Sequence, residues 1–351
     1  MPDDRTTVTE LGTALGTLPY PDPAAALADR PGALKVAAAE WDLLEDIYRS
    51  GRYAGEWSTA FANGRALLQA ADGLRNRTPL TIEWTGGRRP PGDEVAPIDL
   101  RIDHVYLVSC KYESDILANA SPARLFEGLL ATQGTWDRGD WYDTVAPDQL
   151  QHLYRSCLAA TGLSAFPPTP QACSRDQLAT LRRALVGRAY PDVASRSAYA
   201  DLCRAVSEAS ARRWSDQVAS SGIGHEGMLW RLLRIGSAPY FVLGNDRRTG
   251  LPARYRIASP WDWRSSFELE EFTVTPAVAG QPRVDWSARY RSREDDRTGT
   301  VAGHVEIRWS HGRFAQPPEA KVYLDTPMSE LPGYHPLAPD EPAQPTLWAV
   351  R

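Results

Sequence analysis

The sequence of 351 residues has no excess of positive charge, since 39 Lys and Arg stand against 44 Asp and Glu for a formal net charge of -5. Proteins that bind nucleic acid over a broad surface are usually basic, so this balance counts against a general electrostatic footprint. It does not exclude nucleic acid as a partner, because a phosphate-binding groove needs local rather than net positive charge.

Cysteine is scarce and scattered. Cys110, Cys157, Cys173 and Cys203 form neither a CxxC pair nor a CxxC motif followed by paired histidines. This spacing argues against a structural zinc site and against a disulfide framework. We therefore expect reduced, mostly buried thiols, as in a cytoplasmic protein.

Long hydrophobic runs are also absent. No stretch approaches the roughly 20 apolar residues that span a bilayer, so no membrane partner is expected. Residues 1–20 are polar and contain acidic side chains, unlike a signal or transit peptide. With the unpaired cysteines, these features predict a cytoplasmic location.

Several catalytic motifs are missing. The sequence contains no P-loop, no GxSxG nucleophile elbow and no HExxH zinc motif. These absences argue against a nucleotide-driven motor, an α/β-hydrolase and a zinc protease of the HExxH type. Nothing marks a cofactor site either, so a metabolic enzyme on an unrelated α/β fold stays open as a third class of function.

The chain divides by composition and by the period of its apolar residues. Residues 1–32 are rich in Pro, Ala and Asp and are expected to form a loosely ordered arm. Residues 33–135 mix helical and strand periods, residues 136–236 are mostly helical, and residues 237–351 show short strands separated by turns. The predicted fold class is α/β (α+β), with a helical middle region and a β-rich C-terminal module for recognition or assembly.

One predicted hairpin carries the chemistry. Residues 97–102 and 105–111 are strand-like runs with a short turn between them. Asp99 lies on the first run, and Ser109 and Lys111 share one face of the second. A two-residue turn would put Asp99 opposite Val108, on the wrong face, whereas a three-residue turn would put it opposite Ser109. A carboxylate near a strand-end Lys is the minimum equipment for metal-assisted phosphodiester hydrolysis.

This hairpin resembles the PD-(D/E)xK nuclease superfamily. Pro97-Ile98-Asp99 stands for the first part of the motif, with one extra residue, and Ser109-Cys110-Lys111 stands for the acidic-x-Lys part. The resemblance covers about residues 80–130 and implies a restriction-endonuclease-like core. It also implies a hydrolase, specifically a DNA endonuclease that uses Mg²⁺ or Mn²⁺ in a restriction-modification or antiviral defence system.

The sequence departs from the family at Ser109, which is a poor magnesium ligand where an acidic residue is usual. A second carboxylate must then come from elsewhere if the hairpin is active. We favour Glu83 and Glu113, which are near in sequence, as metal ligands beside Asp99. Helical glutamates that remain as alternatives are Glu40, Glu45 and Glu56.

Arginine side chains near the hairpin are candidates for phosphate contacts, which position DNA without specifying its sequence. They are Arg88, Arg89, Arg101 and Arg124. Aromatic and Arg residues interleave after Trp230, which suits either a sheet with one packed face or a surface that stacks on a flipped base. A double-strand cutter needs two active sites, which favours a homodimer.

A second candidate site lies near the C-terminus. Glu319-Ala320-Lys321 is a literal acidic-x-Lys, Glu306 is a conceivable first carboxylate, and His304 and His311 flank the hairpin as candidate bases. The apolar run follows the Lys instead of preceding the Glu. We therefore interpret this hairpin chiefly as part of a recognition or assembly surface.

Two classes of function follow. The first is the nuclease described above. The alternative is a catalytically inactive, nuclease-like subunit that binds DNA or scaffolds partner proteins in a defence complex. The acidic net charge and Ser109 favour the second class, whereas Lys111 favours the first.

Overall fold

The computed structural model describes residues 3–86, 98–112, 116–128, 139–185, 190–221 and 224–338. The chain divides into two compact units. Unit 1 comprises Met1–Asp115, Arg234–Ser265 and Met328–Arg351, and unit 2 comprises Ile116–Leu233 and Ser266–Pro327. This division differs from the sequential one expected from the sequence, because the helical middle and the long C-terminal strands belong to one unit.

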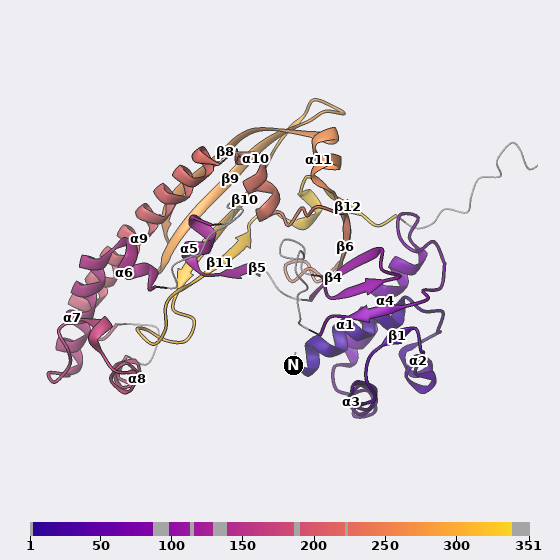
Figure 1. Ribbon diagram of the computed structural model, residues 1–351, viewed down its shortest axis with the longest axis horizontal. Coiled ribbons are helices and arrows are strands. Elements are labelled where there is room, and N and C mark those ends of the chain that lie inside the picture. The colour runs from indigo at the N-terminus through magenta and orange to yellow at the C-terminus, as the bar shows by residue number, and fades with distance from the viewer. Residues whose placement is uncertain are drawn as a thin grey trace, which may run out of the picture. The chain divides into compact units, whose positions relative to one another are not determined.

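Unit 1 contains a mixed sheet in the order β1-β2-β3-β4-β6-β7-β12 (Figure 1). Its strands are β1 (Leu34–Lys35), β2 (Ile82–Trp84), β3 (Leu100–Ile102), β4 (Tyr106–Tyr112), β6 (Tyr240–Asn245), β7 (Pro252–Ile257) and β12 (Tyr334–Pro336). Strands β2, β3 and β4 run antiparallel, whereas β6 lies parallel to β4. Parallel neighbours need a crossover connection, and here that connection contains most of unit 2.

The helices of unit 1 are α1 (Asp4–Gly16), α2 (Pro23–Asp29), α3 (Ala38–Arg49), α4 (Ala54–Gln69) and α11 (Pro260–Ser266), with a short 3-10 turn, η2 (Met328–Glu330). The N-terminal helices and one face of the sheet share a hydrophobic core that includes Leu11, Leu15, Trp57, Leu100 and Val108. Residues of the helices and residues of the sheet belong to this one core, so the same packing stabilises both.

Residues 4–16 form a buried helix rather than the loosely ordered arm expected from composition. Asp3 caps α1 by accepting a 2.7 Å hydrogen bond from the Thr6 N–H. The helix packs tightly against α4 at two glycines. A Cβ on Gly16 would lie 2.1 Å from the Phe61 carbonyl oxygen, and a Cβ on Gly64 would lie 2.0 Å from that of Thr13. Only glycine permits this approach of two backbones.

Unit 2 contains an antiparallel sheet in the order β5-β11-β10-β9-β8. Its strands are β5 (Ile116–Ala120), β8 (Phe267–Val278), β9 (Pro282–Ser292), β10 (Thr298–Arg308) and β11 (Glu319–Leu324). Burial alternates along β9, with Val284, Trp286 and Ala288 inside. This is the pattern of a sheet with one packed face, which is the simpler of the two interpretations of its interleaved Trp and Arg residues.

The helices of unit 2 are α5 (Pro122–Phe126), α6 (Trp141–Val145), α7 (Pro147–Thr161), α8 (Arg175–Ala184), α9 (Val193–Ser220) and α10 (Gly224–Leu232), with a 3-10 turn, η1 (Pro170–Ala172). The long helix α9 lies along β8 and β9, and α7 packs on α9 (Figure 1). Ser121 caps α5 and Pro122 occupies its first turn, as the sequence predicts.

The molecule is of mixed α and β structure, which confirms the coarse fold class. Within the described part of the chain, no helix is both long and apolar enough to cross a bilayer. All four cysteines are free thiols, as expected, and Cys157 and Cys203 are buried.

Candidate active site

The β3–β4 hairpin has the register that brings Asp99 and Ser109 together. Leu100 lies opposite Val108 and Ile102 lies opposite Tyr106, so the turn contains three residues, from Asp103 to Val105. The three-residue alternative is therefore the one observed. Asp99 precedes this ladder by one residue and Ser109 follows Val108, which makes the two neighbours across the strands.

The turn residues explain this register. Asp103 and His104 adopt positive φ angles of 49° and 60°. The Asp103 carboxylate accepts hydrogen bonds of 2.8 Å and 2.9 Å from the backbone N–H groups of Leu80 and Thr81. Asp103 thus acts as a turn residue that fastens the hairpin to the start of β2, in agreement with the sequence prediction.

The carboxylate of Asp99 is held in place by β4. Its Oδ2 accepts a 2.6 Å hydrogen bond from the backbone N–H of Cys110 and a longer one, 3.5 Å, from the hydroxyl of Ser109. Ser109 is fully buried. Ser109 therefore faces Asp99 across the two strands as a hydrogen-bond donor to its carboxylate.

Glu10, on α1, is the functional candidate that sequence reasoning missed. Its side chain is buried, with an exposed fraction of 7%, and its Oε2 accepts a 2.6 Å hydrogen bond from the indole N–H of Trp84. Burial and the negative charge of Asp99 raise the pKa of Glu10 from its ordinary value of 4.5 to about 7, while the Lys111 ammonium opposes the rise. Glu10 thus lies within electrostatic reach of both predicted residues.

The pKa of the Cys110 thiol responds to the same charges. Burial raises the pKa of Cys110 well above its usual range. The negative charges of Asp99 and Glu10 act in the same direction, and the positive charge of Lys111 opposes them.

Lys111 lies at the end of β4, where the neighbouring strand comes unusually close. It is paired in register with Gly244 on β6, and a Cβ on Gly244 would lie 1.6 Å from the Lys111 carbonyl oxygen. The buried amide of Asn63 fixes this strand from α4 by donating a 3.0 Å hydrogen bond to the Gly244 carbonyl. Because Gly244 has no Cβ, β6 can lie directly against the backbone of Lys111 on β4.

Other residues predicted for the hairpin site lie elsewhere or outside the described residues. Glu83 lies on β2 in register with Arg101, and its carboxylate is 3.4 Å from His104 at the turn. Arg101 is half-buried in the centre of β3, and Arg124 is exposed on α5 in unit 2. The predicted residues that lie outside the described ranges are Glu113, Arg88 and Arg89.

Two of the three helical glutamates held open by the sequence have other partners. Glu45 forms ion pairs with Arg30 and Arg49, and Glu56 forms one of 3.0 Å with Arg5. Glu40 lies in the first turn of α3. Among the described glutamates of unit 1, Glu10 is the one whose pKa the charge of Asp99 raises.

The second predicted site is assembled on one face of the unit 2 sheet. Glu306 lies opposite Lys321, and the Lys321 ammonium is 3.6 Å from Glu319. Glu319 also accepts a hydrogen bond from Ser310, which lowers its pKa, and the Lys321 and His311 charges act in the same direction. A carboxylate held ionised by so many donors forms a structural ion-pair network more readily than a metal site.

His304 stands apart from that network. Its Nδ1 lies 2.9 Å and 3.0 Å from the two carboxylate oxygens of Asp325, and its ring stacks on Tyr323 at 4.9 Å. The imidazole is therefore oriented by Asp325 instead of by Glu306 or Glu319. Four of the five predicted residues of this site thus lie on β10 and β11, and His311 lies in the loop between these strands, 3.7 Å from Glu319.

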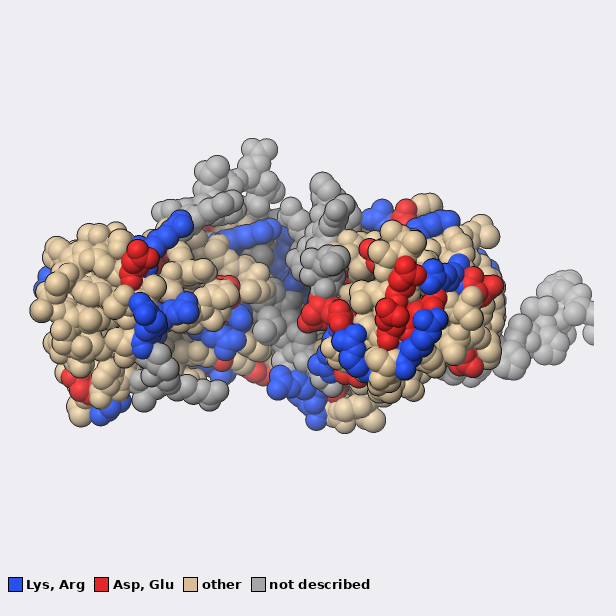
Figure 2. Space-filling model, turned by 90° about the horizontal axis from the view of Figure 1, so that it is seen from below, with Lys and Arg blue, Asp and Glu red and all other residues tan. Residues whose placement is uncertain are grey.

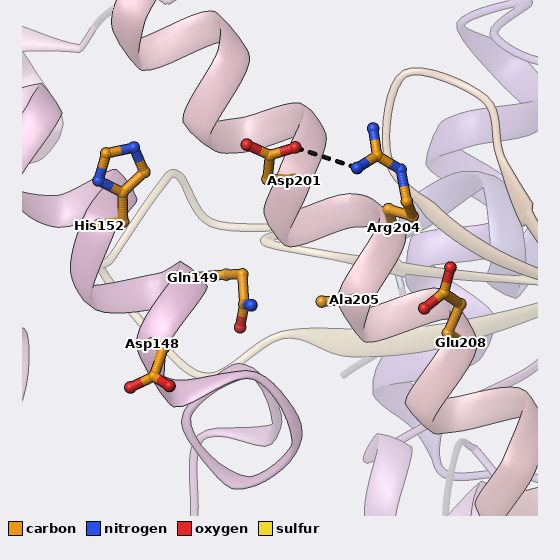
Figure 3. Close-up of a pocket in the computed structure, with 7 residues that line it drawn as sticks. All are labelled: Asp148, Gln149, His152, Asp201, Arg204, Ala205 and Glu208. Atoms are coloured by element: carbon orange, nitrogen blue, oxygen red, sulfur yellow. Dashed lines mark hydrogen bonds and ion pairs between the residues drawn. The ribbon is translucent and has the colours of Figure 1, made fainter.

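A groove in unit 2 lies between α7 and α9 (Figure 3). Figure 3 shows Asp148 and His152 on α7 facing Asp201, Arg204 and Glu208 on α9. Asp201 and Arg204 form an ion pair of 3.1 Å on their own helix. The groove contains none of the residues that the sequence singles out for chemistry.

The surface charge is mixed. On the face shown in Figure 2, acidic and basic side chains intermingle over the unit that carries α1 to α4, and basic side chains elsewhere stand in small groups. No uninterrupted basic area is seen on this face outside the grey atoms. Any contact with nucleic acid there must be local, as the net charge already indicates.

Among the residues that the structure describes, no three His, Cys, Asp or Glu side chains form a group able to hold a metal ion by themselves. Comparison of the chain with protein-family models, with curated proteins and with solved structures gives no match.

Proposed function

We propose that the protein is a metal-dependent nuclease that hydrolyses phosphodiester bonds in DNA, with Asp99, Glu10 and Lys111 as its catalytic group. The observation that carries the proposal is the geometry of the β3–β4 hairpin, in which Asp99 is held by the Cys110 N–H and the Ser109 hydroxyl and Lys111 lies two residues beyond Ser109 on the same strand. The charges of Asp99 and Lys111 both act on the pKa of Glu10. The resemblance of the hairpin to PD-(D/E)xK nucleases supports the proposal. Glu10 supplies, from a helix, the second carboxylate that Ser109 cannot.

The donor set fits a hard divalent cation. Magnesium and manganese ions prefer carboxylate oxygens, and Asp99 with Glu10 would hold one, together with water and substrate oxygens. Burial raises the pKa of Glu10 and the charge of Asp99 raises it further, so a bound cation would stabilise the ionised form of Glu10. Once bound, the metal would lower the pKa of a water molecule and so supply the nucleophile.

Lys111 has a separate task. Its ammonium group lies at the end of β4, within electrostatic reach of Glu10 and of the Cys110 thiol. A positive charge at this point would neutralise charge that builds up on the phosphate as the bond breaks. The close support by Gly244 on β6 restricts how far the Lys111 backbone can move.

Glu10 is suited to proton transfer at neutral pH. A carboxyl group with a pKa of about 7 changes its protonation state near the working pH of a cytoplasmic enzyme. The Trp84 indole fixes the orientation of that carboxyl group by hydrogen bonding to Oε2. The other carboxyl oxygen is then the one that exchanges a proton or contacts a cation.

The alternative, a nuclease-like subunit without activity, has one observation in its favour. The Asp99 carboxylate accepts hydrogen bonds from Cys110 and Ser109, which is also how a purely structural aspartate stabilises a hairpin. Such a subunit would bind DNA or partner proteins without cleaving. The setting in restriction or antiviral defence, and a homodimer, stay predictions of the sequence resemblance.

A plasmid assay separates the two functions. Purified protein is incubated with supercoiled plasmid in Mg²⁺, in Mn²⁺ and in EDTA, beside Lys111→Ala and a matched control, Lys321→Ala. Lys321 is also a strand lysine beside a carboxylate, Glu319, but it lies in unit 2. We expect metal-dependent nicking by the wild type and by Lys321→Ala, and none by Lys111→Ala. Equal nicking by all three proteins would remove Lys111 from the mechanism.

A further inference from the structure

A small polar cavity lies in unit 1, where α4 meets the ends of β4 and β6. It has a volume of about 250 Å³ and is lined by Arg5, Gly55, Glu56, Thr59, Tyr112 and Asn245. Tyr112 follows Lys111 at the end of β4, and Asn245 is its partner in register at the end of β6. The two strands are parallel, so both end at the same edge of the sheet, which is where open α/β sheets bind their ligands.

The charges in the cavity favour a neutral ligand. Arg5 and Glu56 form an ion pair of 3.0 Å on the cavity wall, so the positive charge of Arg5 is already compensated. The Tyr112 hydroxyl is within 2.7 Å of the Thr13 hydroxyl and accepts a 3.2 Å hydrogen bond from Asn63. A free phosphate would meet a carboxylate here, whereas a neutral group with hydrogen-bond donors would meet acceptors.

Asn245 provides one acceptor that the rest of the described protein does not use. Its Oδ1 is shielded from solvent, and no group in the part of the chain that the structure describes donates a hydrogen bond to it. An unsatisfied buried carbonyl oxygen costs about 1 to 3 kcal/mol. A small rotation about the broad χ2 torsion of Asn245 would turn this oxygen toward a donor in the cavity.

We propose that this cavity binds a nucleobase with an exocyclic amine, from the nucleic acid that the protein cuts. The amine would donate to Asn245 and to the Glu56 carboxylate, as adenine, cytosine and guanine allow and thymine does not. This inference rests on the proposed nuclease function and specifies its substrate. A base reaches such a cavity only outside the double-helical stack, so the substrate is single-stranded or has an extruded base.

The test measures binding of dAMP, dCMP, dGMP, dTMP and deoxyribose 5-phosphate to the full chain in EDTA, by calorimetry and by ligand-observed NMR. Gly55→Leu fills the cavity from its wall. A Cβ on Gly55 meets no atom within 4 Å, so this helical position accepts a side chain. Gly32→Leu is the matched control, because its Cβ also meets nothing and Gly32 does not line the cavity. Asn245→Leu removes the acceptor itself.

We expect the three amine-bearing nucleotides to bind at least about fivefold more tightly than dTMP, which corresponds to one hydrogen bond. Gly55→Leu should abolish binding, Gly32→Leu should preserve it, and Asn245→Leu should bring all four nucleotides to the affinity of dTMP. Equal affinity for all nucleotides and for the abasic sugar phosphate would overturn the proposal, as would unchanged binding by Gly55→Leu.

The two proposals can fail separately. Binding is measured without metal and does not depend on cleavage. Amine-selective binding without any metal-dependent nicking would leave the base site standing and reject the nuclease. Nicking by a protein that shows no base selectivity would reject the cavity as a base site and retain the nuclease.

Discussion

The indole N–H of Trp84 donates a 2.6 Å hydrogen bond to the carboxylate of Glu10, joining the strand before the hairpin to the buried N-terminal helix. Charged side chains are rarely this buried unless a partner compensates them. The bond therefore gives Glu10 a fixed place in the interior. Burial and the charge of Asp99 nevertheless raise the pKa of this carboxyl group to about 7, against the opposing effect of the Trp84 hydrogen bond.

The first prediction concerns stability and pH. Because folding raises the pKa of Glu10 from 4.5 to about 7, its contribution to stability is fully present below pH 4.5 and is lost as the pH rises through 7. Glu10→Gln removes this loss. We expect the variant to be more stable than the wild type at pH 8, by roughly 2 to 3 kcal/mol, and similar at pH 4.5. Urea denaturation at both pH values measures the difference. A constant difference at the two values would contradict the assigned pKa.

The second prediction concerns metal binding. A cation held by Asp99 and Glu10 binds only the folded protein, so saturating Mg²⁺ should raise the thermal midpoint of the wild type at pH 8. Asp99→Asn keeps an oxygen that can accept from the Cys110 N–H but loses the charge. Differential scanning calorimetry should show a rise of a few degrees for the wild type and none for this variant. An equal rise in both proteins would place the metal elsewhere.

The third prediction concerns the support of Lys111 by β6. Gly244→Ala would place a Cβ 1.6 Å from the Lys111 carbonyl oxygen, and neither backbone can give way without breaking the sheet. We expect a loss of stability of about 3 kcal/mol or more, measured by chemical denaturation. The control is Gly55→Ala, whose Cβ meets nothing within 4 Å and which should keep or slightly raise stability. Equal stability of both variants would mean that β4 and β6 lie farther apart.

The fourth prediction separates two tryptophans that the sequence presents as equivalent. Trp261 has an exposed fraction of 75%, whereas Trp263 is fully buried two residues later. Trp261→Ala should change the free energy of unfolding by less than about 0.5 kcal/mol, and Trp263→Ala should lower it by about 3 to 5 kcal/mol. Only Trp261 is therefore available to stack on a ligand. A large destabilisation by Trp261→Ala would show that this side chain is buried in solution.

Much of the secondary structure could be predicted because it depends on local patterns. Strand alternation located β3, β4, β9 and β10 to within a few residues, and Ser121-Pro122 marked the start of a helix. The turn length, by contrast, was open in the sequence. It was decided by Asp103, whose carboxylate binds two backbone groups more than twenty residues earlier in the chain.

The N-terminal helix shows why the rest could not be predicted. Val8, Leu11 and Leu15 have helical spacing and Asp3 is a helix cap, but composition directed the interpretation toward a disordered arm. The burial of α1 depends on Gly16 and Gly64, whose close contact only the tertiary structure reveals. Glu10 was therefore missed, and a second carboxylate was sought on neighbouring strands where Glu83 instead pairs with His104.

The units could not be predicted either, because sheet order joins segments that are distant in sequence. Strand β6 pairs with β4 across the whole of the inserted segment 116–233, and β5 pairs with β11 near the other end of unit 2. No local pattern records such pairings. The sequence indicated the presence of β4, β6 and β11, but it indicated neither β5 nor the partners of these strands.

The most direct test of the catalytic group is the rate of Mg²⁺-dependent plasmid nicking by the wild type, Glu10→Gln and Glu306→Gln. Glu306 is the matched control, a carboxylate of the second predicted site that accepts from Arg308 in unit 2. We predict that Glu10→Gln loses about a hundredfold or more in rate and that Glu306→Gln stays within twofold of the wild type. Nicking by Glu10→Gln at the wild-type rate would contradict the account.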